Sequence, residues 1–426
     1  MKEELKPILI ITYYWPPSGG AGVQRWLKFS KYLPEFGWRP IIFTPENPDF
    51  DLKDESLLKD LNPEVEVLKF PIWEPYRIFK RLSGQKELKQ GQILEDARSS
   101  LFKSMAVWLR GNLFVPDPKV FWVKPSVNYL MSILEANNIR HIVTTGPPHS
   151  MHLIGVRLKM KVPSLTWIAD FRDPWTQWEI LQAMKISAPV WRKHKKLEQQ
   201  VIKVADSLLV TSPSAKDEFK QLGARRVEVI TNGYDELDYD DILPEPSGGF
   251  VISHVGMLSS QRNPEALWSS MEGVLDTSEK EIKIRLTGII SPQVLASINK
   301  HPKLASAIEL SESVPHSEVQ KLYAESNLLL LIQTRTERKQ TQLPGKLFEY
   351  LQAKKPILCI GDTQSDLAKI LKDTNSGQCF DYDDLPGITD FIRKVVDGDI
   401  DFTFQNIDQY SRKALTERLA VWLSGF

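Results

Sequence analysis

The eight residues from Leu343 to Tyr350 carry the most specific chemical signal in the chain. A Pro-Gly pair, Pro344 and Gly345, runs directly into an apolar segment with helical spacing that carries Lys346 and Glu349. Amides at a helix N-terminus have partial positive charge that suits a diphosphate, and glycine lets the backbone come close to it. A glutamate one turn further can accept hydrogen bonds from two ribose hydroxyls. The segment therefore predicts a site for a sugar nucleotide.

A second phosphate-binding loop is predicted at residues 255–264, which follow one apolar run and lead into a helix-spaced segment. Gly256 would allow close approach to the backbone. Arg262 is placed to bind phosphate at the start of the helix, where the dipole already favours an anion. Lys346 offers a second cation. The alternative left open is that Arg262 is an ordinary solvated arginine.

In the first half of the chain, a glycine-rich loop follows the first apolar run. Residues 13–25 combine three aromatic side chains that could stack on a sugar with Gly19, Gly20 and Gly22. Glycines here would let donor phosphates or a sugar approach the backbone. A plain tight turn is the alternative explanation of such a loop.

Two further loops carry candidate catalytic groups. His149 lies in the sequence Gly-Pro-Pro-His-Ser and could, as a neutral imidazole, hydrogen-bond a sugar hydroxyl or a departing oxygen. Ser150 is a candidate N-cap for the helix that follows, and a structural role remains open for His149. Asp170, Arg172 and Asp173 end another apolar run, where they form either a substrate site or a structural ion-pair network.

These loops need strands and helices to position them, and the chain supplies both in alternation. Short β-branched runs alternate with helix-spaced segments at residues 7–12, 39–44, 64–70, 141–145, 164–169, 207–210 and 227–230. The pattern restarts with runs at residues 250–254, 283–287, 307–310, 328–332 and 356–360, with helices predicted to begin at Pro264, Ser317, Gly345 and Leu385. Alternation of this kind is typical of parallel, doubly wound sheets, in which ligands bind at the carboxyl ends of the strands.

A Pro/Gly/Ser stretch near residues 244–249 marks the best domain boundary. We therefore expect an N-terminal Rossmann-like domain at 1–240, a linker at 241–249 and a C-terminal Rossmann-like domain at 250–406 that carries the predicted sugar-nucleotide site. The last segment, 407–426, is predicted to be a helix that crosses back to the first domain.

Residues 72–118 do not follow the alternation and are interpreted as a basic amphipathic insertion. Between Arg77 and Arg110 there are eight Lys or Arg and three acidic residues. Such a segment could contact anionic lipid or acceptor, or its apolar face could pack over the space between the domains.

Composition excludes several classes of protein. The 426 residues contain 54 Lys plus Arg and 54 Asp plus Glu, so the net charge gives no reason to expect a nucleic-acid partner. No run of about 18 apolar residues predicts a transmembrane helix. The only two cysteines, Cys359 and Cys379, argue against a disulfide framework. A reducing, cytoplasmic compartment fits, and peripheral contact with the inner face of the cytoplasmic membrane is left open.

Seven motifs taken in order resemble those of the family 4 glycosyltransferases of the GT-B fold. They are the glycine loop after the first strand, Gly-Pro-Pro-His-Ser at 146–150, Asp-Phe-Arg-Asp-Pro-Trp at 170–175, Thr-Asn-Gly-Tyr-Asp at 231–235, Val-Gly with Arg262, Val-Pro-His-Ser-Glu at 314–318 and Pro-Gly-Lys-Leu-Phe-Glu-Tyr at 344–350. The resemblance extends over nearly the whole chain. It implies an α/β protein of two Rossmann-like, doubly wound domains facing a cleft, with 1–240 as the acceptor domain and 250–406 as the nucleotide-sugar domain.

The resemblance also implies roles for particular residues. Glu349 would bind the ribose, Arg262 the diphosphate, and His149 the sugar near the reacting centre. The candidate catalytic residues are His149, Asp170 and Arg172, and the candidate donor-binding residues are Gly19, Gly20, Gly22, Gly256, Arg262, Thr341, Pro344, Gly345, Lys346 and Glu349. Members of the family are retaining enzymes in which the leaving diphosphate helps to take the acceptor's proton. Cationic side chains and helix N-termini can stabilise that diphosphate, so we expect no cofactor and no required metal.

Two positions depart from the family pattern. Thr341 stands where many relatives have a second glutamate that binds sugar hydroxyls, which leaves the sugar open. Met257 stands where an arginine often follows the glycine, and we hypothesise that Lys346 replaces the missing cation.

Two Asp-Tyr-Asp sequences, 238–240 and 381–383, are similar to the metal-binding motif of the other large glycosyltransferase fold. One lies beside the predicted linker and the other among acidic residues late in the chain. We interpret both as solvated turns.

Together these features predict an enzyme that transfers a sugar from a nucleoside diphosphate sugar to a saccharide or lipid-linked saccharide acceptor in surface polysaccharide biosynthesis. A nucleotide-sugar epimerase is one alternative, with Asp170 and Asp173 as the acid and base. A non-catalytic nucleotide-sugar-binding partner protein is another, suggested by Thr341 and Met257.

Overall fold

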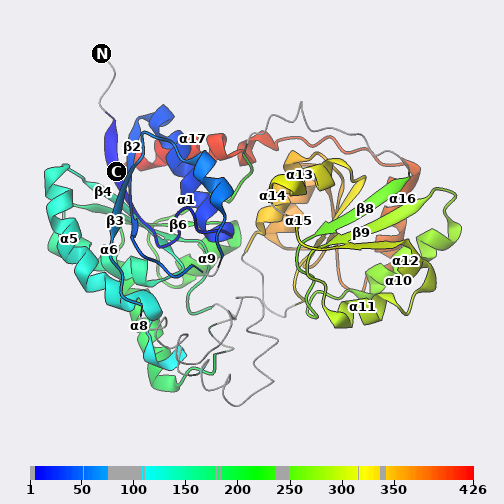
Figure 1. Ribbon diagram of the computed structural model, residues 1–426, viewed down its shortest axis with the longest axis horizontal. Helices are drawn as coiled ribbons and strands as arrows, with labels where there is room; N and C mark the ends of the chain where they lie inside the picture. Colours follow the sequence, from blue (N-terminus) through cyan, green and yellow to red (C-terminus); the bar gives the residue numbers. More distant parts are fainter. Residues whose placement is uncertain are drawn as a thin grey trace. The chain divides into compact units, whose positions relative to one another are not determined.

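The computed structural model describes residues 5–50, 52–74, 108, 111–177, 181, 184–235, 249–314, 316–335 and 342–426. The chain forms two compact units, Met1–Thr231 with Arg412–Phe426, and Asn232–Ser411 (Figure 1). The first unit thus ends at Thr231, before the predicted limit at residue 240. The predicted linker 241–249 lies outside the described residues except for Gly249, and so does most of the predicted insertion 72–118.

Within the described residues, the first unit is built on a seven-stranded parallel sheet in the order β3-β2-β1-β4-β5-β6-β7. The strands are β1 (Lys6–Ile11), β2 (Trp38–Pro45), β3 (Glu66–Phe70), β4 (His141–Gly146), β5 (Thr166–Phe171), β6 (Ser207–Val210) and β7 (Val227–Val229). The order reverses between β1 and β4, which is the doubly wound arrangement that the sequence predicts.

Helices cover both faces of this sheet, because alternate residues of the strands point to opposite faces. Ile8 and Ile10 of β1 pack in a cluster with α1 (Ala21–Tyr32) and with α17 (Arg412–Leu423). Leu9 and Ile11 belong to the cluster on the other face, with α5 (Val123–Ala136), α6 (Ser150–Lys161), α8 (Ala188–Val204) and α9 (Pro213–Gln221). The first unit also contains the short turns η1 (Leu33–Phe36), η2 (Glu55–Asp60) and η3 (Pro118–Trp122).

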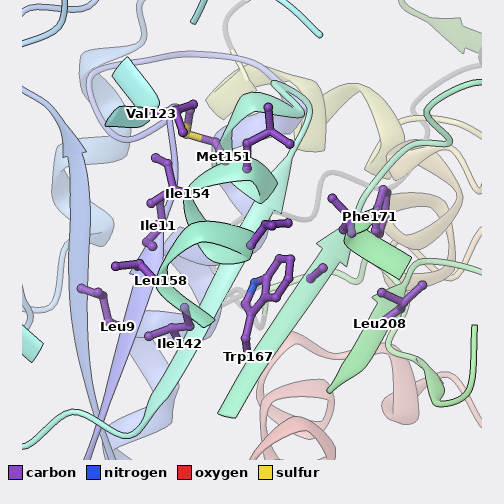
Figure 2. Close-up of a cluster of buried hydrophobic side chains, with 14 of the residues drawn as sticks. Leu9, Ile11, Val123, Ile142, Met151, Ile154, Leu158, Trp167, Phe171 and Leu208 are labelled. Atoms are coloured by element: carbon purple, nitrogen blue, oxygen red, sulfur yellow. The ribbon is translucent and has the colours of Figure 1, made fainter. Parts of the chain in front are cut away.

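Helix α6 lies in the hydrophobic cluster that contains Leu9 and Ile11 (Figure 2). Met151, Ile154 and Leu158 point from it toward the strands, and Trp167 of β5 packs beside it. A Cβ atom at Gly155 would lie 2.2 Å from the indole of Trp167. Glycine is required there because the helix backbone touches the ring, and this contact fixes the helix that begins next to His149.

Within the described residues, the second unit is built on a six-stranded parallel sheet in the order β10-β9-β8-β11-β12-β13. The strands are β8 (Phe250–Val255), β9 (Ile282–Thr287), β10 (Ile308–Ser311), β11 (Leu328–Ile332), β12 (Ile357–Ile360) and β13 (Gly377–Phe380). One face packs on α10 (Glu265–Thr277), α11 (Pro292–Ile298), α12 (Pro302–Ala307) and α16 (Leu385–Asp397). The other packs on α13 (His316–Ala324), α14 (Gly345–Gln352) and α15 (Asp366–Asp373).

The predicted C-terminal helix is confirmed from Arg412 onward. The structure has a 3-10 turn, η5 (Asp408–Tyr410), a break at Ser411 and then α17. Leu415 and Leu419 are fully buried in the cluster that contains α1, and the Trp38 indole donates to the carbonyl of Ala420 at 3.4 Å. The last helix of the chain therefore belongs to the first unit. None of the described helices combines the length and the apolar character needed to span a membrane.

Candidate functional site

Helix α14 of the second unit presents an uncapped N-terminus. Pro344 is its N-cap residue and Gly345 its first residue. No side-chain capping bond is made by the N-cap residue, and the first turn carries no acidic residue. It follows β11, a strand of five fully buried or nearly buried residues, so its N-terminus lies after the carboxyl end of a central strand. Backbone donors in this position are available to an anionic ligand.

Lys346 and Gly256 lie in contact. Gly256 follows the carboxyl end of β8 with φ of 119°, and a Cβ atom on it would lie 2.2 Å from the Nζ of Lys346. Only glycine adopts this backbone conformation readily, and only glycine leaves room for the ammonium. Residues 256 and 346, ninety positions apart in the sequence, therefore form one surface at the carboxyl edge of the sheet.

Arg262 provides a second cation in the same unit. Its Nε donates to Thr334 Oγ1 at 3.2 Å and its Nη1 to the carbonyl of Met257 at 3.5 Å. Both acceptors are neutral, so these bonds orient the guanidinium without neutralising it. Burial lowers the pKa of Arg262 from its ordinary value.

The electrostatics of these two side chains favour an anion. The pKa of Lys346 is lowered to about 8, mainly by burial and also by the nearby charge of Arg262, while Glu349 opposes the change. His254, at the end of β8, is buried, and burial together with the charge of Lys346 lowers its pKa to about 3. The histidine is therefore neutral at physiological pH. A pair of repelling cations is stabilised when a diphosphate binds between or beside them.

Glu349 is held in place by a tyrosine from a neighbouring helix. The hydroxyl of Tyr323, on α13, donates to Glu349 Oε2 at 2.9 Å. Tyr323 is 1% exposed and packs edge-on against Tyr350 with ring centroids 5.0 Å apart. A carboxylate can accept several hydrogen bonds, so Glu349 keeps capacity to accept hydroxyl groups of a ligand.

Of the predicted donor-binding residues in this unit, the structure brings together Gly256, Lys346 and, through electrostatic interactions, Arg262 and Glu349. Pro344 and Gly345 begin the same helix. Thr341 lies outside the described residues, in the segment 336–341. Sequence reasoning missed Tyr323 and His254. A polar residue at the end of an apolar strand could have indicated His254, whereas no local signal marks Tyr323.

In the first unit, the three predicted glycines have different surroundings. A Cβ atom on Gly19 would lie 2.8 Å from Leu52, and one on Gly22 would lie 2.9 Å from Arg172 and 3.1 Å from Tyr14. Gly20 has a φ of 87° and is the N-cap residue of α1. The small size of Gly19 and Gly22 is thus already required by packing inside the unit, which supports the tight-turn alternative for these two.

Asp170 is the centre of a buried ion-pair network. It is fully buried at the end of β5 and pairs with Arg25 at 3.1 Å. The Trp26 indole and the Thr145 hydroxyl each donate to Asp170 Oδ2 at 2.7 Å. Arg25 in turn donates to the carbonyl of Thr231. Such complete pairing is what stabilises a buried charge, so the geometry favours the structural alternative for Asp170.

Arg172 connects two loops of the first unit. Its guanidinium donates to the carbonyls of Gly22, Gly146 and Pro147. It also lies over the ring of Tyr14, 5.7 Å from the centroid. Arg172 therefore fixes the glycine loop against the loop that contains His149.

His149 is the predicted catalytic residue whose polar atoms remain unused. It is 6% exposed and stacks on Trp175 with centroids 4.6 Å apart and planes 2° apart. Neither ring nitrogen has a hydrogen-bond partner among the described residues. Burial lowers its pKa well below the ordinary value, so the ring is neutral, as the sequence predicts for a group that hydrogen-bonds a sugar.

The expected capping role of Ser150 is wrong in detail. Ser150 is the first residue of α6, and its amide and hydroxyl both donate to Asp117, at 2.8 and 2.7 Å. Burial raises the pKa of Asp117. A carboxylate already occupies this helix N-terminus, so an anionic ligand is not needed there. Among the residues that the structure describes, no group of three or more His, Cys, Asp or Glu is arranged to hold a metal ion.

Comparison with known proteins gives matches of structure and not of sequence. No family model and no curated protein sequence matches the chain. Among solved structures, a sucrose-phosphate synthase from Thermosynechococcus elongatus has a TM-score of 0.59 and 13% identity, covering 99% of this chain and 98% of that one. Anabaena Alr3699/HepE in complex with UDP-glucose has a TM-score of 0.58 and 13% identity, covering 99% and 100%. WaaG, a glycosyltransferase involved in lipopolysaccharide biosynthesis, has a TM-score of 0.56 and 12% identity, covering 98% and 100%. With its two doubly wound parallel sheets and its returning C-terminal helix, this chain has the GT-B fold.

Proposed function

We propose that the chain is a glycosyltransferase that uses a nucleoside diphosphate sugar. The observation that carries the proposal is the contact between Lys346 and Gly256 at the carboxyl edge of the second sheet, beside the uncapped start of α14. The Lys346 ammonium is partly buried and under-compensated there, and Glu349 follows it one turn later. These groups have the chemistry to bind a diphosphate and a ribose.

The resemblance to family 4 and the fold of the structural neighbours support transfer rather than binding alone. In the proposed reaction, negative charge grows on the diphosphate as the bond to the sugar breaks. Lys346, Arg262 and the α14 amides stabilise that charge more strongly in the transition state than in the ground state, which is the requirement for catalysis. We propose retention of configuration, a family 4 assignment and no required metal on the same grounds.

In the first unit, His149 is proposed to hydrogen-bond the transferred sugar, since it is neutral and both of its nitrogens lack partners among the described residues. Asp170 and Arg172 are proposed to act by positioning the loops around it. An epimerase would need two free carboxylates as acid and base. The full pairing of Asp170 weighs against that alternative.

The acceptor is proposed to be a saccharide or a lipid-linked saccharide in surface polysaccharide biosynthesis, with contact to the inner face of the cytoplasmic membrane. WaaG, one of the similar structures, is involved in lipopolysaccharide biosynthesis. Two exposed aromatic residues lie near the ends of the predicted basic insertion 72–118. Trp73 is 58% exposed and Phe121 is 44% exposed, with ring centroids 5.0 Å apart. Aromatic side chains beside basic residues are typical of peripheral membrane contacts.

The test is a panel of nucleoside diphosphate sugars, beginning with UDP sugars because UDP-glucose is bound in one similar structure. The protein is incubated with each donor, with and without acceptor extract, and the products are separated. A transferred sugar is expected only when acceptor is present. Epimer formed without acceptor, or binding with no product from any donor, would contradict the proposal. Lys372→Ala, which removes an exposed lysine of α15 in the same unit, is the control for the loss of one positive charge.

A further inference from the structure

The two cysteines of the chain lie next to each other in the second unit. Cys359 of β12 and Cys379 of β13 are register partners in adjacent parallel strands. Their Sγ atoms are 3.3 Å apart, with the Cys379 thiol directed at the Cys359 sulfur. The chain has only these two cysteines, and the sequence alone gave no reason to pair them because 20 residues separate them.

The backbone geometry allows the two sulfurs to be joined. Both side chains point to the face of the sheet that packs on α14 and α15, since Cys359 and Cys379 belong to the same hydrophobic cluster. Neighbouring strands are about 4.8 Å apart, which lies within the range of Cα separations that a disulfide spans. Closing the bond requires the sulfurs to approach from 3.3 Å to about 2.05 Å, a movement within the reach of side-chain rotation.

The two thiols differ in access to solvent. Cys379 is half-buried on the edge strand, whereas Cys359 is fully buried. Burial raises the pKa of the Cys359 thiol well above its ordinary value. An oxidant dissolved in water therefore meets Cys379 first, and Cys359 is placed to react with the product.

We propose that Cys359 and Cys379 form an oxidation site that a peroxide converts into an intramolecular disulfide. The Cys379 sulfur attacks one peroxide oxygen, the O–O bond breaks, and a sulfenic acid and one water form. The Cys359 sulfur then attacks the sulfenic sulfur, the S–O bond breaks, and a second water leaves. In sum, two thiols lose two electrons and two protons, and hydrogen peroxide is reduced to two molecules of water.

The disulfide would covalently link the edge strand β13 to β12. Strand β13 has four residues and, within the part of the chain that the structure describes, lies at the edge of the sheet and pairs with β12 alone. A short edge strand opens more easily than the central strands do. We expect amides of residues 377–380 to exchange with solvent more slowly in the oxidised protein than in the reduced protein.

The test is oxidation of the full-length native protein with a small excess of hydrogen peroxide. The expected product is a monomer whose mass falls by two hydrogen atoms, which has no titratable thiol after unfolding, and in which digestion links the peptides of the two cysteines. Reduction with dithiothreitol restores both thiols. Covalent dimers, a sulfinic acid at Cys379 beside a free Cys359, or two thiols that stay unreacted would each overturn the proposal.

Two variants test the order of the steps. Cys379→Ser is expected to leave the buried Cys359 thiol unmodified under the same treatment. Cys359→Ala is expected to accumulate a sulfenic acid at Cys379 that dimedone traps. Rapid oxidation of Cys359 in the Cys379→Ser protein would contradict the assignment of Cys379 as the first site, and the wild-type measurement stands even where a variant folds poorly.

Discussion

Replacing Lys346 by methionine should have opposite effects on stability and on nucleotide binding. Methionine keeps most of the apolar length of the lysine side chain and removes its charge. The pKa of Lys346 lies at about 8, below its ordinary value of 10.5. One pKa unit corresponds to about 1.4 kcal/mol, so keeping Lys346 charged lowers the stability of the ligand-free protein by about 3 kcal/mol. Because the side chain keeps some contact with water, we expect Lys346→Met to raise the free energy of unfolding by about 1.5 kcal/mol at pH 7.

Binding should change in the other direction. A hydrogen bond between an ammonium and a diphosphate contributes about 1.5 to 3 kcal/mol, so Lys346→Met should weaken UDP binding by about 10- to 100-fold. The wild-type protein should also lose about tenfold in affinity between pH 7 and pH 9, as the protonated fraction falls from about nine-tenths to about one-tenth. The variant should show no such step.

The pH dependence of stability gives a separate check. The pKa of Lys346 is lowered in the folded state, so the unfolded chain binds more protons between pH 8 and pH 10.5. The cost of the buried charge is therefore complete below about pH 8 and disappears as the pH rises to 10.5. The stability difference between Lys346→Met and wild type should shrink across this window in urea titrations.

Calorimetric titration with UDP measures the change in nucleotide affinity, and urea denaturation measures the change in the free energy of unfolding. Both are done at pH 7 and pH 9, with Lys372→Ala as the control. If Lys346→Met bound UDP as tightly as wild type did, or if its ligand-free form were the less stable one, the assignment of Lys346 as the diphosphate cation would be wrong.

Three further changes have expected outcomes. Tyr323→Phe should weaken nucleotide binding by about 3- to 10-fold, because it frees the Glu349 carboxylate to rotate, and should leave the folded structure intact by circular dichroism. Gly256→Ala should lower the free energy of unfolding by about 1 to 3 kcal/mol, and the new methyl group should displace Lys346 and weaken UDP binding. An unchanged UDP affinity would refute the contact between the two residues. Asp170→Asn should lower the free energy of unfolding by about 3 to 5 kcal/mol, since it leaves a buried guanidinium uncompensated, and a stable variant would refute the structural role.

The fold could be predicted because its strands are buried on both faces. A parallel sheet covered on both sides requires continuous apolar runs, and 328–332 is such a run. Strand β13 could not be predicted in this way. It lies at an edge, only its last residue is buried, and its sequence, Gly-Gln-Cys-Phe, shows no period. Three short helices of the second unit, α11, α12 and α15, are likewise not predicted from the sequence.

The candidate site could be predicted only where one loop carries several of its parts. Pro344, Gly345, Lys346 and Glu349 are neighbours in sequence and remain neighbours in the structure. The contacts that decide their roles are long-range: 26 residues separate Tyr323 from Glu349. A sequence pattern reports what a residue type can do, whereas its surroundings decide which of those roles it has.

The buried charge of Asp170 in the first unit is compensated, whereas the charges of Lys346 and Arg262 in the second unit receive little compensation. This contrast supports the location of the diphosphate site. Asp170 is paired with a guanidinium and accepts from two further donors, so folding alone satisfies it. Lys346 and Arg262 instead repel each other and are oriented by neutral acceptors or by glycine backbone. Burying two cations with so little compensation lowers stability. Such an arrangement is explained when a bound anion supplies the missing negative charge. Binding then removes the repulsion between the two cations, so the cost that they impose on the ligand-free fold contributes to affinity.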